Sequence, residues 1–378
     1  MINFPFFILP LLLRELSSLS TVTEKMISCF RVNKKDQAME NLTRNGGLLL
    51  EKLIAFTNGR GNSIGRSFSL NDLKIATHNY DSDQVILTEG LYILYNGLLQ
   101  NRKVIVKKYK DETYLKDSAI KYDRNLEDCI SDIVFSSQTK LHNHVLKLLG
   151  CCLDSSIPIL VFEDAEKRSL DDYIYNLNNR PDFRPLSWKN RVKIAVDVAN
   201  VIAYLHTAFS RPIVHRNIKT RIILLDEDYG AKLSDFSLSI SMPEGETHLN
   251  DAVKGTIGHI APEYARELTF NEKIDVYSFG VVLLVLLTGQ NPCIPFPDIE
   301  HEYSGMVFVI NKRIENDRLE EIIDHTLFED GTWSEKEQQI RAFLMLALHC
   351  TSKDPEDRPE ITDVGKQLRE MYQSLISN

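Results

Sequence analysis

The sequence predicts an α+β fold of two lobes, in which a small β-rich lobe with one helix precedes a larger helical lobe. Short β-rich runs are confined to residues 85–110 and 145–163, with helical spacing between them at about 125–140. Beyond residue 170 the pattern is mostly helical. We therefore expect four parts: an apolar leader at 1–38, a helical extension and glycine-rich linker at 39–66, the β-rich lobe at 67–165 and the helical lobe at 166–378.

Composition narrows the class of protein. The chain has 378 residues, 26% of them charged, with a net charge of −9. An acidic balance argues against nucleic acid as a partner. The six cysteines include no C-x-x-C pair and no zinc-ligand spacing. We therefore expect reduced thiols in a cytoplasmic protein and no metal site.

The apolar N-terminal residues allow two interpretations. Residues 1–13, MINFPFFILPLLL, are apolar but fewer than the roughly 20 that a spanning helix needs. The run has the length of a signal-peptide core, and on that reading the sequon at Asn41 would be glycosylated. The alternative is that translation starts downstream, at Met26 or Met39.

The elements of the first lobe follow from local patterns. Residues 39–56 carry apolar positions at helical spacing before a glycine-rich stretch, and Ser69 with Asp72 forms a capping box that begins a short helix. The runs VILTEG, LYILYNG and KVIVKKY predict strands, with Asn96-Gly97 and Asn101-Arg102 as turns. After the helix at 125–140, VLKLLGCCL and PILVFE predict two more strands.

The second lobe contains one strongly apolar run, FGVVLLVLLTG at 279–289. It is too short to span a bilayer. We predict a buried helix that Gly289 closes, with Asp275 just before it.

Six motifs in a fixed order resemble those of protein kinases over residues 67–375. They are Val104-Ile105-Val106-Lys107, the loop HRNIKTRI at 215–222, Asp235-Phe236-Ser237, GTIGHIAPEY at 255–264, DVYSFG at 275–280 and DPEDRP at 354–359. The resemblance implies that Lys107 pairs the nucleotide phosphates and that Asp235 holds magnesium. It also implies framework roles for Asp275 and for a buried ion pair of Glu263 with Arg358.

Two chemical groups are missing from the loop at 215–222. In a kinase the third residue is the Asp that accepts the substrate proton, and the eighth is an Asn that holds magnesium. Here they are Asn217 and Ile222, which offer neither a basic carboxylate nor a ligand oxygen. A positioned base contributes about 10²–10⁴ in rate. The sequence therefore predicts a pseudokinase.

The glycine-rich loop that covers the phosphates is also lost. Aligning Tyr95-Asn96-Gly97 with the kinase pattern places the three glycine positions at Leu87, Glu89 and Tyr92. Tyr92 is large enough to fill the phosphate space. Glu89 would repel a triphosphate by about 4 kcal/mol per charge pair at 4 Å and an effective dielectric of 20.

Several assignments stay open. Register counted back from the next strand places the helix acid that pairs with Lys107 at Ile133, one residue from Asp132. Lys107 and Asp235 would suit either nucleotide binding or a structural ion pair between the lobes, so ATP is an optional rather than a required cofactor. Arg216 matches the arginine that engages a phosphorylated activation loop. The candidate modification sites are hydroxyls in that segment: Ser237, Ser239, Ser241, Thr247 and Thr256.

Segments outside these motifs indicate a narrower family within the protein kinases. NGGLLLEKLIAF, FSLNDLKIATHNY, VLKLLGCCLD and AKLSDFSLSISMPEG resemble the ZED-related (ZRK) plant receptor-like cytoplasmic pseudokinases, relatives of wall-associated kinases. The resemblance implies an adaptor in plant immunity, located in the cytoplasm or at the plasma membrane through its partners. Its implied partners are a coiled-coil nucleotide-binding leucine-rich-repeat receptor, receptor-like cytoplasmic kinases and pathogen effectors. Two alternatives remain: a weak protein kinase, and a secreted or membrane receptor fragment.

Overall fold

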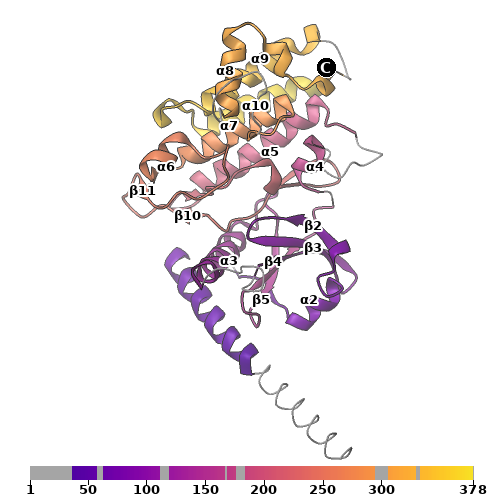
Figure 1. The fold of residues 1–378 in the computed structure, drawn as a ribbon, viewed down its shortest axis with the longest axis vertical. Coiled ribbons are helices and arrows are strands. Elements are labelled where there is room, and N and C mark those ends of the chain that lie inside the picture. The colour runs from indigo at the N-terminus through magenta and orange to yellow at the C-terminus, as the bar shows by residue number, and fades with distance from the viewer. Residues whose placement is uncertain are drawn as a thin grey trace, which may run out of the picture.

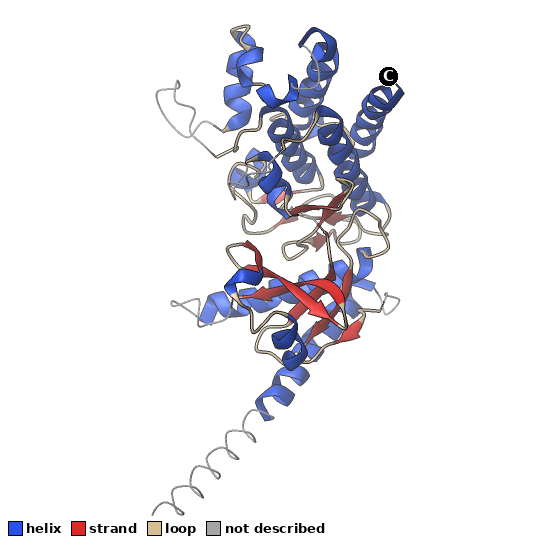
Figure 2. Ribbon diagram, turned by 90° about the vertical axis from the view of Figure 1, so that its right-hand side faces the viewer, coloured by secondary structure: helices blue, strands red, loops and turns tan. Residues whose placement is uncertain are grey.

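The computed structural model describes residues 36–57, 63–110, 119–166, 168–175, 184–293, 305–328 and 333–377. Figure 1 shows a sheet lobe below a helical lobe, with an N-terminal helix along the outside of the sheet lobe. Figure 2 shows the same two lobes from the side, with most strands in the lower one. This is the predicted protein-kinase arrangement. The apolar leader up to residue 35 and the linker residues 58–62 lie outside the described residues.

The sheet of the first lobe has six strands. They are β1 (Arg66–Ser67), β2 (Val85–Thr88), β3 (Tyr92–Leu99), β4 (Arg102–Tyr109), β5 (Leu148–Cys152) and β6 (Ile159–Glu163), in the order β1-β5-β6-β4-β3-β2. All neighbours are antiparallel except β1, which pairs with β5 in parallel. A Cβ at Gly150 would lie 1.9 Å from the Arg66 carbonyl oxygen, so only glycine allows β1 to approach this closely.

The prediction of a turn at Asn96-Gly97 is wrong. Both residues lie inside β3, opposite Ile105 and Val104 of β4. The turn is made by Gln100 and Asn101, whose φ values of 51° and 63° fit a two-residue hairpin loop. Glycine at 97 serves packing instead, because a Cβ there would lie 3.1 Å from a Val104 methyl group.

Two helices accompany the sheet. In α2 (Leu70–Ala76) the predicted capping box is present, with Ser69 accepting from the Asp72 amide and Asp72 accepting from the Ser69 amide. In α3 (Ala119–Thr139) the helix begins six residues earlier than its apolar spacing predicted. The candidate helix acid, Asp132, lies on α3 and is fully buried.

The N-terminal helix, residues 36–57, packs on the first lobe through polar and aromatic contacts. Asn45 Nδ2 donates to the Leu153 and Ser155 carbonyls, both at 2.9 Å, and the Phe56 ring lies 5.0 Å from that of Phe135 on α3. Asn41 is buried and donates to the Asp154 carbonyl. The sequon is therefore not accessible in this fold, which counts against the secreted alternative.

The second lobe is built from helices around one large hydrophobic core, with a second, smaller cluster near α6. Its helices are α4 (Leu170–Ile174), α5 (Trp188–Thr207), α6 (Pro262–Glu267), α7 (Lys273–Thr288), α8 (Met306–Glu315), α9 (Trp333–Cys350) and α10 (Ile361–Ser377). Its short strands are β7 (Ile213–Val214), β8 (Ile223–Leu225), β9 (Ala231–Leu233), β10 (Ile240–Ser241), β11 (Leu249–Asn250) and β12 (Thr269–Phe270). Short 3-10 helices lie at Ser82–Gln84 in the first lobe and, in the second lobe, at Thr220–Ile222, Leu319–Ile322, His325–Phe328 and Pro355–Asp357.

The predicted buried helix is α7, which is buried along nearly its whole length. Gly289 caps it with φ 66°, as predicted. Asp275 lies in the first turn of α7 rather than before the helix, because the helix begins at Lys273. No helix within the described residues combines the length and apolar character needed to cross a membrane. The five cysteines of those residues are free thiols: Cys129, Cys151, Cys152, Cys293 and Cys350.

Candidate functional site

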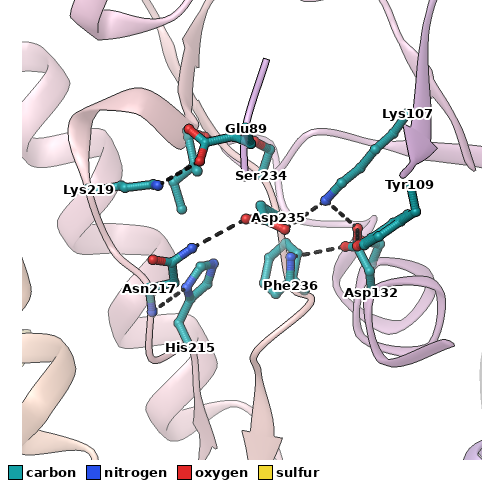
Figure 3. Close-up of polar contacts among 12 residues, drawn as sticks. Glu89, Lys107, Tyr109, Asp132, His215, Asn217, Lys219, Ser234, Asp235 and Phe236 are labelled. Carbon is teal, nitrogen blue, oxygen red and sulfur yellow. Dashed lines mark hydrogen bonds and ion pairs between the residues drawn. The ribbon is translucent and has the colours of Figure 1, made fainter. Parts of the chain in front are cut away.

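The site lies between the lobes and is centred on Lys107 (Figure 3). The register of β4 points this lysine inward, where its Nζ lies 2.6 Å from Asp132 Oδ2 on α3 and 2.7 Å from Asp235 Oδ1. The structure therefore decides the register question in favour of Asp132 over Ile133. Asp132 also accepts hydrogen bonds from Tyr109 and from the Phe236 amide, so both of its oxygens are satisfied.

The opposite charges of Lys107 and Asp235 stabilise each other inside the protein. Burial alone would raise the pKa of the Asp235 carboxyl, but the Lys107 ammonium outweighs it and lowers the pKa to about 2. Burial opposes the charge of Lys107 as well, and the two aspartates raise its pKa. Asp235 has a φ of 65°, a conformation that a non-glycine residue adopts at a cost. Lys107 and Asp235 are therefore both charged at neutral pH, and each stabilises the charge of the other.

The catalytic loop holds Asn217 in the position of a base. Asp275 fixes the loop by accepting from the amides of His215 and Arg216 at 2.7 and 2.9 Å. Asn217 donates through Nδ2 to Asp235 at 3.3 Å and accepts from Thr256 at 2.9 Å. The amide thus links the loop to Asp235 and to the activation segment, and it has no proton-accepting carboxylate.

The position expected to hold the second magnesium is apolar. Ile222 is fully buried in the core of the helical lobe, at the end of the Thr220–Ile222 turn. The Ile222 side chain supplies no ligand oxygen, so the loop at 215–222 carries neither the base nor the magnesium ligand of an active kinase.

Glu89 replaces a glycine of the kinase glycine-rich loop with a charged side chain. It lies at the β2–β3 turn, with Oε2 3.0 Å from Lys219 Nζ and Oε1 2.7 Å from Arg221 Nε. Arg221 also donates to the Thr88 carbonyl at 2.9 Å. The sequence analysis predicted that Glu89 repels phosphate, but it did not predict that Glu89 pairs with Lys219 and Arg221. The sequence feature that could have indicated these partners is that both basic residues flank Thr220 in the loop.

The other two glycine positions are filled. Tyr92 is buried, and Lys107 Nζ lies 3.7 Å from its ring centroid. Burial, together with the Asp235 and Glu89 carboxylates, raises the pKa of the Tyr92 phenol well above its ordinary range. Leu87 is buried in a hydrophobic cluster that includes Ile105 and, from the other lobe, Leu224. The residues present therefore do not fit a magnesium triphosphate: buried side chains stand at two of the three glycine positions, Glu89 brings a negative charge to the third, and Asp235 already contacts Lys107 and Asn217.

The activation segment is organised by Arg216. This buried guanidinium lies 2.9 Å from Asp251 Oδ2 and contacts the Tyr264 hydroxyl. Asp251 was not singled out from the sequence, because a lone aspartate in a loop gives no signal. The predicted modification candidates differ in access. Ser237 and Ser239 are buried, Ser241 and Thr256 are half-buried, and Thr247 is exposed.

The framework ion pair forms as the resemblance implied. Arg358 Nη1 and Nη2 each lie 2.7 Å from an oxygen of Glu263. Arg358 also donates to the carbonyls of Lys273 and Ser352, so it joins α6, α7 and the segment before α10.

Comparison with known proteins agrees with this geometry. The family described as protein tyrosine and serine/threonine kinase matches residues 89–368. The serine/threonine-protein kinase ZRK1 of Arabidopsis thaliana is 36% identical over 343 residues, which cover 90% of this chain and 95% of the relative. The non-functional pseudokinase ZED1 of the same plant is 36% identical over 89% of this chain and 97% of its own. The chain belongs to the ZED-related group of protein kinases.

The wider similarity includes receptor kinases. Wall-associated receptor kinase-like 4 of Arabidopsis thaliana is 34% identical over 89% of this chain but only 42% of its own length. Among the relatives in the ZED-related group, ZRK1 is named a kinase, whereas ZED1 and ZRK2 are named non-functional pseudokinases. Group membership alone therefore does not decide whether this chain transfers phosphate.

Proposed function

We propose that this member of the ZED-related group is a catalytically inactive kinase-like adaptor in plant immunity. It would couple effector-modified receptor-like cytoplasmic kinases to a coiled-coil nucleotide-binding leucine-rich-repeat receptor, in the cytoplasm or at the plasma membrane through its partners. The observation that carries the proposal is Asn217, an amide held by Thr256 and Asp235 where a catalytic base is needed. A kinase fold that is maintained without its base is suited to binding rather than to turnover.

Two further features support a binding role. The name of ZED1 describes a non-functional pseudokinase, and this chain aligns with nearly all of it. The N-terminal helix, which lies outside the catalytic core, also leaves several large apolar side chains exposed. They are Met39, Leu42, Leu48, Leu50 and Ile54.

The adaptor role is tested by affinity purification of the tagged chain from leaf tissue, with mass spectrometry of the proteins that accompany it. We expect a nucleotide-binding leucine-rich-repeat receptor in near-stoichiometric amount. Leu50→Glu should lower that recovery at least ten-fold if the N-terminal helix contributes, since a charge at an interface core is poorly tolerated. Ile376→Glu is the matched control, because the two side chains are 59% and 52% exposed and lie at opposite ends of the chain. Absence of any such receptor from the wild-type sample would contradict the adaptor role.

Nucleotide should leave the protein unchanged. A ligand that binds only the folded state stabilises it by about 2.7 kcal/mol at 100 times its Kd, and Tm rises accordingly. We expect no change of Tm in 1 mM magnesium-ATP, because Tyr92 replaces a loop glycine beside Lys107 and Glu89 occupies the cations Lys219 and Arg221. Differential scanning fluorimetry measures this directly. A reproducible rise of Tm with ATP would show that the phosphate space opens.

A weak protein kinase is the second candidate function. It is favoured by the name of ZRK1 and by the intact ion pair of Lys107 with Asp132. The test is transfer of radiolabelled phosphate from ATP to a general protein substrate. Activity that persists in the wild type and disappears in Lys107→Ala would establish a kinase, whereas equal background in both supports the adaptor.

A further inference from the structure

Protein kinases depend on two phosphate groups that lie on fixed basic residues: the terminal phosphate of ATP and, in many of them, a phosphate on the activation loop. In this chain two carboxylates lie on basic residues of the corresponding segments. We propose that Glu89 and Asp251 are built-in substitutes for these phosphates. They hold the lobes closed and the activation segment ordered without nucleotide and without phosphorylation.

Glu89 joins the two lobes through two cations. Its carboxylate has one oxygen 3.0 Å from Lys219 Nζ and the other 2.7 Å from Arg221 Nε, so each oxygen has its own positive partner. Lys219 and Arg221 belong to the catalytic loop of the helical lobe, whereas Glu89 belongs to the β2–β3 turn of the sheet lobe. Figure 3 shows the contact of Glu89 with Lys219. A carboxylate and a phosphate present oxygens of the same charge to such cations.

The burial of Glu89 distinguishes this contact from an ordinary surface ion pair. Exposed pairs contribute only about 0–1 kcal/mol because water screens them. The Glu89 side chain is only 14% exposed and that of Lys219 only 10%. Lys110 adds a third contact by donating to the Glu89 carbonyl at 2.6 Å, which fixes the turn itself.

Asp251 neutralises a cation that the fold buries. The Arg216 side chain is 2% exposed, and its acidic partner is Asp251, with Nη2 to Oδ2 at 2.9 Å. Partial burial would raise the pKa of the Asp251 carboxyl, but the Arg216 charge outweighs it and lowers the pKa. The aspartate is therefore ionised at neutral pH, and the buried arginine is compensated without a phosphate.

The interior between the two carboxylates is already in a closed arrangement. Lys107 of the sheet lobe pairs with Asp235 of the helical lobe at 2.7 Å, and Leu224 of the helical lobe packs in the same cluster as Leu87 and Ile105 of the sheet lobe. These contacts leave no role for a nucleotide in drawing the lobes together. A closed kinase fold of this kind presents one constant surface.

Hydrogen exchange of the full chain, measured by mass spectrometry, tests the proposal. Charge-assisted contacts of this kind are worth about 1.5–3 kcal/mol, so we expect Glu89→Gln to speed amide exchange about ten-fold or more over residues 85–99 and 215–225. Asp251→Asn should do the same over residues 237–260. Glu321→Gln is the matched control, because Glu321 also lies between two arginines, at 3.0 Å from Arg313 and 2.5 Å from Arg318, but inside the helical lobe. It should leave both regions unchanged.

An anion probe strengthens the test. Tripolyphosphate at millimolar concentration should slow exchange again over residues 85–99 and 215–225 in Glu89→Ala, because Lys219 and Arg221 are then free to bind it. The wild type should not respond. Unchanged exchange in Glu89→Gln, or slower exchange in the wild type on addition of magnesium-ATP, would overturn the proposal. The readout involves no partner protein, so failure here is distinguishable from failure of the adaptor role.

Discussion

Replacing Lys107 by methionine should lower the free energy of unfolding by about 3–5 kcal/mol, although no nucleotide is present. The methionine fills a similar volume but leaves the Asp132 and Asp235 carboxylates buried without their shared cation, with side chains 0% and 4% exposed. Urea unfolding followed by circular dichroism measures the change. Lys103→Met is the control, since this lysine is on the same strand but exposed, and it should change stability by less than about 0.5 kcal/mol.

The pH dependence of this effect has a definite sign. In the wild type the pKa of Asp235 falls from 3.8 to about 2, so its contribution is complete above pH 4 and is lost between pH 4 and pH 2. In Lys107→Met the cation that outweighs burial is lost, and only the weaker effects of the Ser237 hydrogen bond and of His215 still oppose it. We therefore expect the pKa of the Asp235 carboxyl to rise and folding to be penalised at neutral pH. Acidification protonates the buried carboxyl and relieves that penalty. The stability gap between wild type and variant should therefore be larger at pH 7 than at pH 4.5.

This experiment separates the two roles that the sequence left open for Lys107. If Lys107 served only to bind nucleotide, it would contribute little to the free energy of unfolding when no nucleotide is present. If Lys107 forms a structural ion pair between the lobes, its full contribution to the free energy of unfolding is present without nucleotide. A loss below 1 kcal/mol at pH 7, equal to that of Lys103→Met, would contradict the structural role.

The sequence predicted the fold well where local patterns are strong. The capping box at Ser69, the hairpin strands and the apolar helix closed by Gly289 all form as expected, because caps, alternation and uninterrupted apolar runs act over a few residues. The turn at Asn96-Gly97 failed for a reason that lies outside the local sequence. That glycine is required by packing against Val104, and a turn is not the only structure that needs a glycine.

The candidate site was predicted in part. The losses at Asn217 and Ile222 are visible from motif positions alone. The ion pairs of Glu89 with Lys219 and Arg221 and of Arg216 with Asp251 join segments 35 to 132 residues apart, so no sequence spacing signals them. The choice between Asp132 and Ile133 likewise depended on the length of the loop after α3, which the motif did not fix.

Replacing Arg358 by alanine should lower the free energy of unfolding by about 3–5 kcal/mol. The guanidinium is fully buried, and it satisfies Glu263 at two 2.7 Å contacts as well as the carbonyls of Lys273 and Ser352. Its removal leaves a largely buried glutamate without its cation, removes the Arg358 donors from the carbonyls of Lys273 and Ser352, and leaves a cavity. Glu263→Gln keeps the shape and loses only the charge, so its cost should be smaller.

The effect of Arg358→Ala should be concentrated where α6 meets the segment before α10, because Arg358 joins these parts of the helical lobe. Arg341→Ala is the control, since Arg341 pairs with Glu337 on the exposed face of one helix and such pairs contribute about 0.3–0.5 kcal/mol. Chemical unfolding gives the two free energies, and hydrogen exchange over residues 255–268 locates the change. Equal losses in Arg358→Ala and Arg341→Ala would contradict the framework role. A large loss confined to Arg358→Ala would show that a chain without its catalytic base still depends on the ion pair that shapes its activation segment.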